Sequence, residues 1–370
     1  MKPKIKFTNK DKTQFFNVLK QRVDNYFIEN KISQHANWKM VVKSIFMLAL
    51  YYVPYSFIIS GNTAGWSFWL CWVLIGLGLA GIGMGIMHDA NHGAYSSKNW
   101  VNRMMGHTVS LVGADLNNWK TQHNILHHTY TNIYDHDEDI DDKVGMRFSP
   151  SGKHQKIQRF QVFYAFFFYS LMTLYWTTSK DFMQFARYVR EGHNKDIKRD
   201  RIKKFIAMIF FKVLYYSYML VLPLLILDNP WYQIVLGFLL MHAVAGIVLS
   251  VTFQLAHVVE GTTFPVPDDK GNIENEWAIH QLNTTADFAA KNPIVTFYVG
   301  GLNYQAIHHL FPRICHVHYP DIAPIVEQTA KEFGIRYIYF PTAMEAFMSH
   351  LRMLKKLGRN EIRHLAAEMG

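Results

Sequence analysis

Four runs of roughly 20 apolar residues constrain the fold of this chain more than any other feature, because that length lets a helix cross a bilayer. They lie at about 41–60, 66–87, 205–227 and 231–256. Half of the 370 residues are hydrophobic, and 18% are charged, a share below that of typical soluble domains. We therefore expect an all-α, polytopic membrane protein with four transmembrane helices.

Two short connections join these runs in pairs and contain no Lys or Arg. They are GNTAG at 61–65 and DNP at 228–230. Apart from Lys212, which lies in the third run, the positive charges flank or separate the two hairpins. By the positive-inside rule, both turns face outward, while both termini and the central region face the cytoplasm. The net charge of +10 then follows from topology, which argues against a nucleic-acid partner.

This reading divides the chain into three parts. Residues 1–40 form a cytoplasmic segment without the apolar core of a signal peptide. Residues 41–320 form the membrane domain, and residues 321–370 form a cytoplasmic helical segment. The aromatic stretch 160–178 is expected to lie at the membrane interface, since crossing would place later residues on the other side.

The second run contains glycines in the pattern G-x-G-x-x-G at Gly76, Gly78 and Gly81. That pattern marks a dinucleotide site only after a strand and at the start of a helix. Inside a membrane helix, small residues let neighbouring helices approach closely. We therefore interpret these glycines as helix-packing positions.

Seven histidines form three clusters that the topology places on the cytoplasmic side. They are His88, His92, His123, His127, His128, His308 and His309. The i, i+4 spacing in the first two clusters puts two imidazoles on one helix face. Titratable groups at a membrane are costly and tend to be functional, so the clusters predict a metal centre held in a cytoplasmic helical cap. Seven ligands exceed the four of a structural zinc site and indicate two metals. Imidazole binds iron, copper, nickel and zinc, so ligand type does not identify the metal.

Three sequence stretches carry a family resemblance. HDANHGAYS, QHNILHHTYTN and LNYQAIHHLFP resemble the three histidine boxes of integral-membrane fatty acid desaturases, over about residues 40–320. Gln305 stands where many acyl-CoA desaturases have histidine. With glutamine at this position, the chain is similar to the front-end desaturases of the linoleoyl-CoA type. The chain lacks the His-Pro-Gly-Gly haem motif of a fused cytochrome domain, so the resemblance implies an external electron donor of ferredoxin or cytochrome type.

The resemblance implies oxygen-dependent formation of a cis double bond in a fatty-acyl chain, catalysed by two iron ions with O2 as co-substrate. The active site is then expected at the cytoplasmic face, in the inner membrane if the source is bacterial. All seven clustered histidines are implied as catalytic metal ligands. Further ligands are expected among His257, which closes the fourth run, His280, and Gln305.

Three other residues are candidates for supporting roles. Trp119, four residues before His123, is expected to line the acyl tunnel, with ordinary core packing as the alternative. Asp89 and Asp137 are expected to orient ligand imidazoles, because carboxylates commonly accept a hydrogen bond from a metal-bound histidine.

Two alternative functions stay open. The nearest is another histidine-box oxidase, such as a hydroxylase, a ketolase or a sphingolipid desaturase. A membrane metal transporter or sensor is a different class, and it needs ligands along a path within the spans. The residues leave open the bond position, the chain length, the electron donor, the oligomeric state and the acyl carrier, which is CoA, a carrier protein or a lipid.

Overall fold

The computed structural model describes residues 5–10, 12–141, 145–193 and 196–362. The chain divides into two compact units. Unit 1 contains Met1–Asn37, Gln122–Ala165 and Val251–Gly370, and unit 2 contains Trp38–Thr121 and Phe166–Ser250. Both units are mainly helical. Three helices contribute residues to both units: η2 (Thr121–His127), α9 (Gln161–Tyr175) and α13 (Trp231–His257).

Four helical stretches are long and apolar enough to cross a membrane. They are Trp38–Ile59, Trp66–His92, Lys198–Ile226 and Trp231–His257. Each of these stretches contains or overlaps one of the four apolar runs of the sequence, so the four expected apolar helices are present. The third helix begins before the apolar run, because the basic stretch that precedes the run is also helical. The aromatic helix α9 has 15 residues and is not among the four described candidates.

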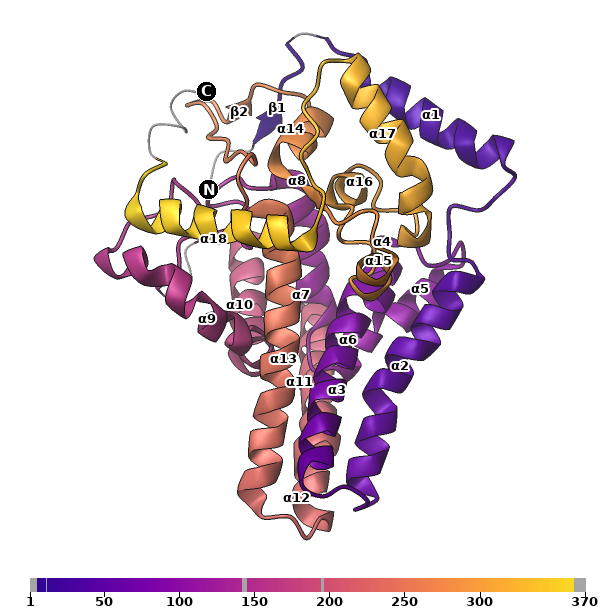
Figure 1. Ribbon diagram of the computed structural model, residues 1–370, viewed down its shortest axis with the longest axis vertical. Helices are drawn as coiled ribbons and strands as arrows, with labels where there is room; N and C mark the ends of the chain where they lie inside the picture. Colours follow the sequence, from indigo (N-terminus) through magenta and orange to yellow (C-terminus); the bar gives the residue numbers. More distant parts are fainter. Residues whose placement is uncertain (1–4, 11, 142–144, 194–195, 363–370) are drawn as a thin grey trace. The chain divides into compact units, whose positions relative to one another are not determined.

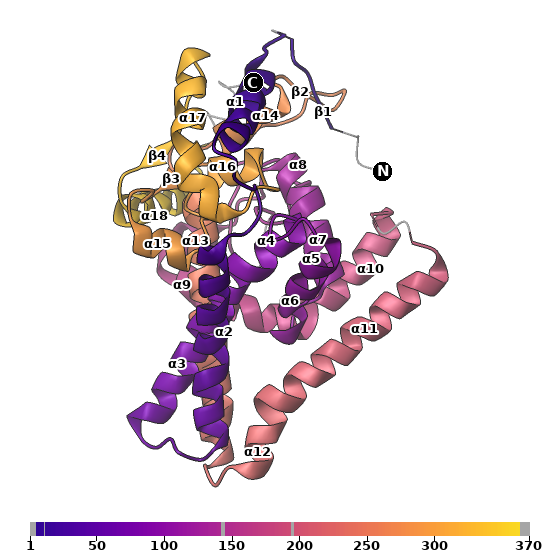
Figure 2. The same cartoon turned by 90° about the vertical axis from the view of Figure 1, so that its right-hand side faces the viewer.

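Unit 2 is built from helices alone in the described residues. They are α2 (Trp38–Ile59), α3 (Trp66–Gly81), η1 (Ile82–Met87), α4 (His88–His92), α5 (Asn99–Gly106), α6 (Thr108–Leu111), α7 (Leu116–Lys120), η4 (Trp176–Lys180), α10 (Asp181–Glu191), α11 (Lys198–Tyr216), η5 (Ser217–Val221) and α12 (Leu222–Ile226). Helix α2 packs along α3 (Figures 1 and 2). The connections 60–65 and 227–230 lie at the same end of this unit in both views.

Glycines in α3 allow the close helix contacts of unit 2. A Cβ atom on Gly78 would lie 2.6 Å from the backbone nitrogen of Tyr51 in α2. A Cβ atom on Gly76 would lie 2.6 Å from the carbonyl oxygen of Met241 in α13. These contacts confirm that the G-x-G-x-x-G pattern serves helix packing.

Unit 1 combines short helices with two pairs of short parallel strands. Its other elements are β1 (Lys6–Phe7), α1 (Phe15–Glu29), α8 (His128–Tyr130), η3 (Lys156–Phe160), β2 (Asn272–Ile273), α14 (Trp277–Thr284), β3 (Asp287–Phe288), α15 (Pro293–Tyr298), α16 (Gln305–Leu310), η6 (His316–His318), α17 (Tyr319–Glu332), β4 (Tyr339–Phe340) and α18 (Ala343–Arg359). Lys6 and Phe7 pair with Asn272 and Ile273, and Asp287 and Phe288 pair with Tyr339 and Phe340.

One apolar core in unit 1 positions α16, the helix that carries the third histidine cluster. Residues of α1, α14, α16 and α17 share this core, and Figure 1 shows α1 beside α17. The start of α16 is fixed by Asp287, whose Oδ1 accepts a hydrogen bond from the backbone nitrogen of Ala306 at 2.8 Å. A carboxylate at a helix N-terminus satisfies an otherwise unpaired N–H group.

Candidate metal centre

The second histidine cluster begins on a π-helix, η2, which passes directly into α8. A π-helix pairs residues five apart, whereas an α-helix pairs residues four apart. Accordingly, Nε2 of His123 lies 3.2 Å from Nε2 of His128, five residues along the chain. The i, i+4 spacing expected for this segment therefore does not account for all of its neighbouring rings, because the wider π-helical turn also brings His128 beside His123.

Unit 1 gathers three buried imidazoles from three separate elements. They are His127 on η2, His257 at the end of α13 and His309 on α16. Their potential metal-binding atoms lie within 4.8 Å of one another. Nε2 of Gln305 lies 2.9 Å from Nε2 of His257 and 3.2 Å from Nε2 of His309. The three rings and this amide form one buried group, which we call the three-histidine group.

The Nδ1 atom of each ring in the three-histidine group lies beside an oxygen. The pairs are His127 with Oδ2 of Asp137 at 3.0 Å, His257 with the carbonyl oxygen of Thr284 at 3.3 Å, and His309 with Oε1 of Gln281 at 2.7 Å. Metal-bound histidines typically donate their other N–H group in this way. In the described structure, the buried Nε2 of His127 has no hydrogen-bond partner. An unpaired buried nitrogen calls for a ligand, so the donor set fits a metal ion.

A buried carboxylate adds negative charge to this group. Asp137 also accepts hydrogen bonds from the backbone nitrogens of Asn132 and Asp139, each at 3.0 Å. Burial by itself lowers the pKa of His127, but the Asp137 carboxylate outweighs this effect and leaves the pKa raised. The same pairing overcomes burial at Asp137 and lowers its pKa. The carboxylate is therefore ionised and accepts the Nδ1–H of His127.

A second group of rings in unit 1 contains His123, His128 and His308. Their ring centroids lie 4.6–5.8 Å apart. Nδ1 of His308 lies 3.2 Å from the hydroxyl of Tyr319. His128 also stacks on His309, with centroids 4.4 Å apart. The second and third histidine clusters of the sequence thus form one continuous assembly.

The first histidine cluster lies in unit 2 on the short helix α4. The ring centroids of His88 and His92 are 4.9 Å apart, and the indole of Trp119 lies edge-on to both, at 5.7 and 6.0 Å. Trp119 also belongs to an apolar cluster with Met87. Asp89 is buried, with Oδ1 3.9 Å from Nδ1 of His88.

The structure does not bring His280 into a candidate metal group among the described residues. Its buried ring packs against Phe7, with centroids 5.0 Å apart, and burial lowers its pKa to about 4. Successive helix residues point about 100° apart, and it is the next residue, Gln281, that reaches His309. Sequence reasoning missed Gln281; the available signal was a glutamine directly after the candidate ligand His280 in the chain.

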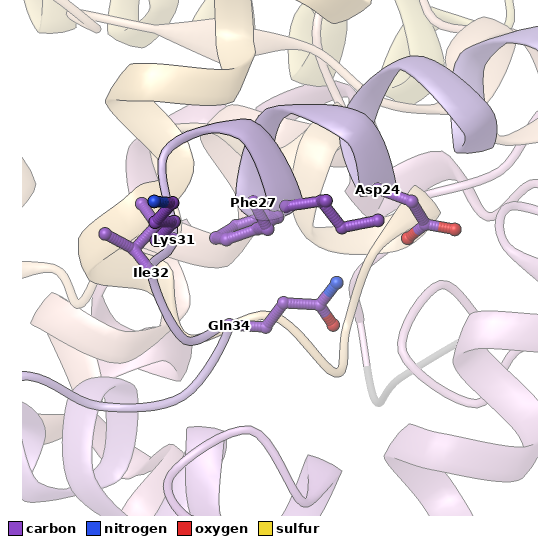
Figure 3. Close-up of a pocket in the computed structure, with 6 residues that line it drawn as sticks. Asp24, Phe27, Lys31, Ile32 and Gln34 are labelled. Carbon is purple, nitrogen blue, oxygen red and sulfur yellow. The ribbon is translucent and has the colours of Figure 1, made fainter.

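A surface depression elsewhere in unit 1 does not belong to this centre. It is lined by Asp24, Phe27, Ile28, Lys31, Ile32 and Gln34 at the end of α1 and in the segment that follows (Figure 3). None of the six is a histidine, and the depression is open to solvent.

Comparison with known proteins decides the family. The sequence profile described as "Fatty acid desaturase" matches residues 64–341. This chain belongs to the fatty acid desaturase family. It is 37% identical to the sn-1 linoleoyl-lipid 6-desaturase of Arthrospira platensis over 92% of each chain. It is 36% identical to a Synechocystis enzyme of the same name, over 96% of this chain and 98% of the relative. It is 34% identical to the acyl-lipid (8-3)-desaturase of Physcomitrium patens, over 98% of this chain and 75% of the relative.

Membership establishes this desaturase as an oxidoreductase of lipid metabolism. The resemblance expected from the three histidine boxes is confirmed, including its likeness to front-end enzymes. The four apolar helices agree with a membrane enzyme. The histidine groups provide a donor set that could hold metal ions.

Proposed function

We propose that this desaturase forms a cis double bond in a fatty-acyl chain with two histidine-bound iron ions, O2 and electrons from a separate donor protein. The observation that carries the proposal is the three-histidine group, in which three Nδ1 atoms lie beside oxygens and one potential ligand nitrogen of each ring lies within 4.8 Å of the others. Bound iron would supply the oxygen chemistry that unactivated methylene groups require, which side-chain acids and bases do not provide.

The chain's own residues hold and orient the metal ions in this proposal. His127, His257 and His309 bind through Nε2, and Gln305 contributes its amide oxygen after rotation of the side-chain amide. Amide rotation exchanges oxygen and nitrogen at nearly the same positions. Asp137 keeps the Nδ1 proton of His127 in place, which leaves Nε2 as the donor atom.

Ligand roles also extend to the remaining clustered histidines. His123, His128 and His308 form the second group of unit 1, and Tyr319 orients the His308 ring. His88 and His92 are assigned by their match to the first histidine box, and Asp89 is proposed to orient the His88 ring. His280 is left out of the proposed ligand set, because none of the candidate metal groups among the described residues includes it.

The apolar cluster of unit 2 is the proposed contact surface for the acyl chain. It contains Met87, Val109, Ala114, Leu116 and Trp119. Trp119 joins this cluster to the rings of His88 and His92. A rigid apolar wall next to metal ligands would fix which carbons react, because reacting groups must be held in register with the catalyst.

We propose that the four apolar helices form two transmembrane hairpins, with the active site at the cytoplasmic face. The absence of Lys and Arg from both turns supports this orientation, as does the position of both turns at one end of unit 2. An acyl group carried by a membrane lipid is the proposed substrate, because the relatives above are named as linoleoyl-lipid or acyl-lipid desaturases.

Expression in a host that lacks polyunsaturated lipids tests this function. The wild-type chain should produce a new double bond in the membrane lipids, located by mass spectrometry after derivatisation. His308→Ala should abolish the product while the protein still accumulates in the membrane fraction. Purified wild-type protein should contain two irons per chain.

The matched control is His154→Ala. Nε2 of His154 lies 2.8 Å from the carbonyl oxygen of Gly358, and His154 is outside the histidine groups, so this variant should retain the product. Wild-type product formation by His308→Ala would refute the metal assignment. A hydroxylated product would instead place the protein among the other histidine-box oxidases.

A further inference from the structure

Gln281 makes hydrogen bonds that connect the second and third histidine clusters. Its side chain is fully buried on α14. Oε1 lies 2.7 Å from Nδ1 of His309 and 2.8 Å from the hydroxyl of Thr131, and Nε2 lies 3.4 Å from the carbonyl oxygen of His128. One amide thus contacts a candidate ligand on α16 and the backbone of the second cluster.

The surroundings of Gln281 determine which way its amide faces. The amide faces the carbonyl oxygen of His128, which can only accept, with Nε2, and it faces the hydroxyl of Thr131, which can donate, with Oε1. This orientation places Oε1, which can only accept, beside His309. Two acceptors do not face each other at 2.7 Å, so Nδ1 of His309 carries the proton.

This protonation state sets the chemistry of the opposite ring nitrogen. In a neutral imidazole with a proton on Nδ1, Nε2 holds a lone pair. The lone pair of His309 therefore points into the three-histidine group.

We propose that Gln281 is a positioning residue that fixes the Nδ1–H form and the ring orientation of His309, so that its Nε2 binds metal. The inference rests on the proposed metal centre. The three rings would then have three different supports: a carboxylate from Asp137, a backbone carbonyl from Thr284 and a neutral amide from Gln281. Polar supports of this kind typically change metal affinity by about 10–100-fold when removed.

Cobalt binding by the purified, metal-stripped protein tests this role without measuring turnover. Co²⁺ is titrated in the presence of a competing chelator, and its visible absorption reports the geometry around the metal. Gln281→Leu removes the acceptor at similar size and should weaken one Co²⁺-binding step by about 10–100-fold. Gln281→Glu retains an acceptor beside His309 and should restore affinity to within a few-fold of wild type.

Gln161→Leu is the matched control. Gln161 is also fully buried, and its amide bonds to the backbone of Arg147 and Leu354. This variant should lower thermal stability and leave both Co²⁺ affinities unchanged. If Gln281 has a positioning role, Gln281→Leu weakens Co²⁺ binding and Gln161→Leu does not. If its role is purely structural, both variants lose stability and neither loses Co²⁺ affinity.

Three results would overturn the inference. The first is that Gln281→Leu binds two Co²⁺ ions with wild-type affinity and absorption. The second is that Gln281→Glu binds Co²⁺ as weakly as Gln281→Leu does. Either result, with two Co²⁺ ions bound by wild type, rejects the role of Gln281 and leaves the proposed function standing. Failure of the wild-type protein to bind Co²⁺ would reject the metal centre as well.

Discussion

Lys212 offers a quantitative test of how unit 2 is held together, because its ammonium group is buried within an apolar helix. Its Nζ lies 2.8 Å from Oδ2 of Asp181 and 2.9–3.2 Å from the carbonyl oxygens of Gly113, Thr177 and Trp176, so its three N–H groups are shared among four acceptors. The side chains of Lys212 and Asp181 are 7% and 0% exposed. Replacing Lys212 with Met removes the cation and leaves a buried carboxylate without its charge partner. Breaking such a pair costs about 3–5 kcal/mol.

Lys204 on the same helix provides a matched control. It forms an ion pair with Asp196 at 2.5 Å, but the two side chains are 38% and 32% exposed. Pairs screened by solvent contribute about 0.2–1 kcal/mol. The loss of unfolding free energy should therefore depend on how deeply each ion pair is buried, and not on the distance between its charges.

The assay is equilibrium unfolding of the purified protein in mixed micelles, followed by circular dichroism. Lys212→Met should lower the free energy of unfolding several times more than Lys204→Met. Adding Asp181→Asn to Lys212→Met should recover part of the loss, because the uncompensated charge is then removed. Equal effects of the two lysine variants, or full additivity in the double variant, would refute the reasoning.

Two further predictions concern unit 1 and the helix contacts of unit 2. Burial lowers the pKa of His350 to about 4, and its Nδ1 lies 2.8 Å from the carbonyl oxygen of Val258. The unfolded chain therefore binds a proton more readily than the folded chain. The free energy of unfolding should fall by about 3 kcal/mol as the pH drops from about 6.5 to about 4. Thermal melts across this range should show a weaker pH dependence for His350→Gln than for the wild type. Gly78→Ala forces a Cβ atom against the backbone of Tyr51 at 2.6 Å and should cost about 1–3 kcal/mol. Gly83→Ala, with its Cβ 3.4 Å from a flexible leucine end, should be nearly neutral in the same unfolding assay.

The sequence by itself determined the features of this desaturase that depend on local patterns. An apolar run of sufficient length favours a membrane helix wherever it occurs, so four apolar helices long enough to cross a membrane were predictable. The three histidine boxes were equally visible, because their residues are close in sequence. The packing role of Gly76 and Gly78 followed from their position inside one of the apolar runs.

Tertiary structure decided which distant side chains meet. His257 and Gln305 lie 48 residues apart, and their side-chain nitrogens come within 2.9 Å. Gln281 and Thr131 lie 150 residues apart and share a hydrogen bond. Spacing along the chain could not choose between His280 and Gln281, since helix rotation depends on what the helix packs against. The π-helical turn that places His123 beside His128 is likewise not encoded in the α-helical spacing. Sequence periodicity thus located the candidate metal ligands, and long-range packing selected how each imidazole is oriented and hydrogen-bonded.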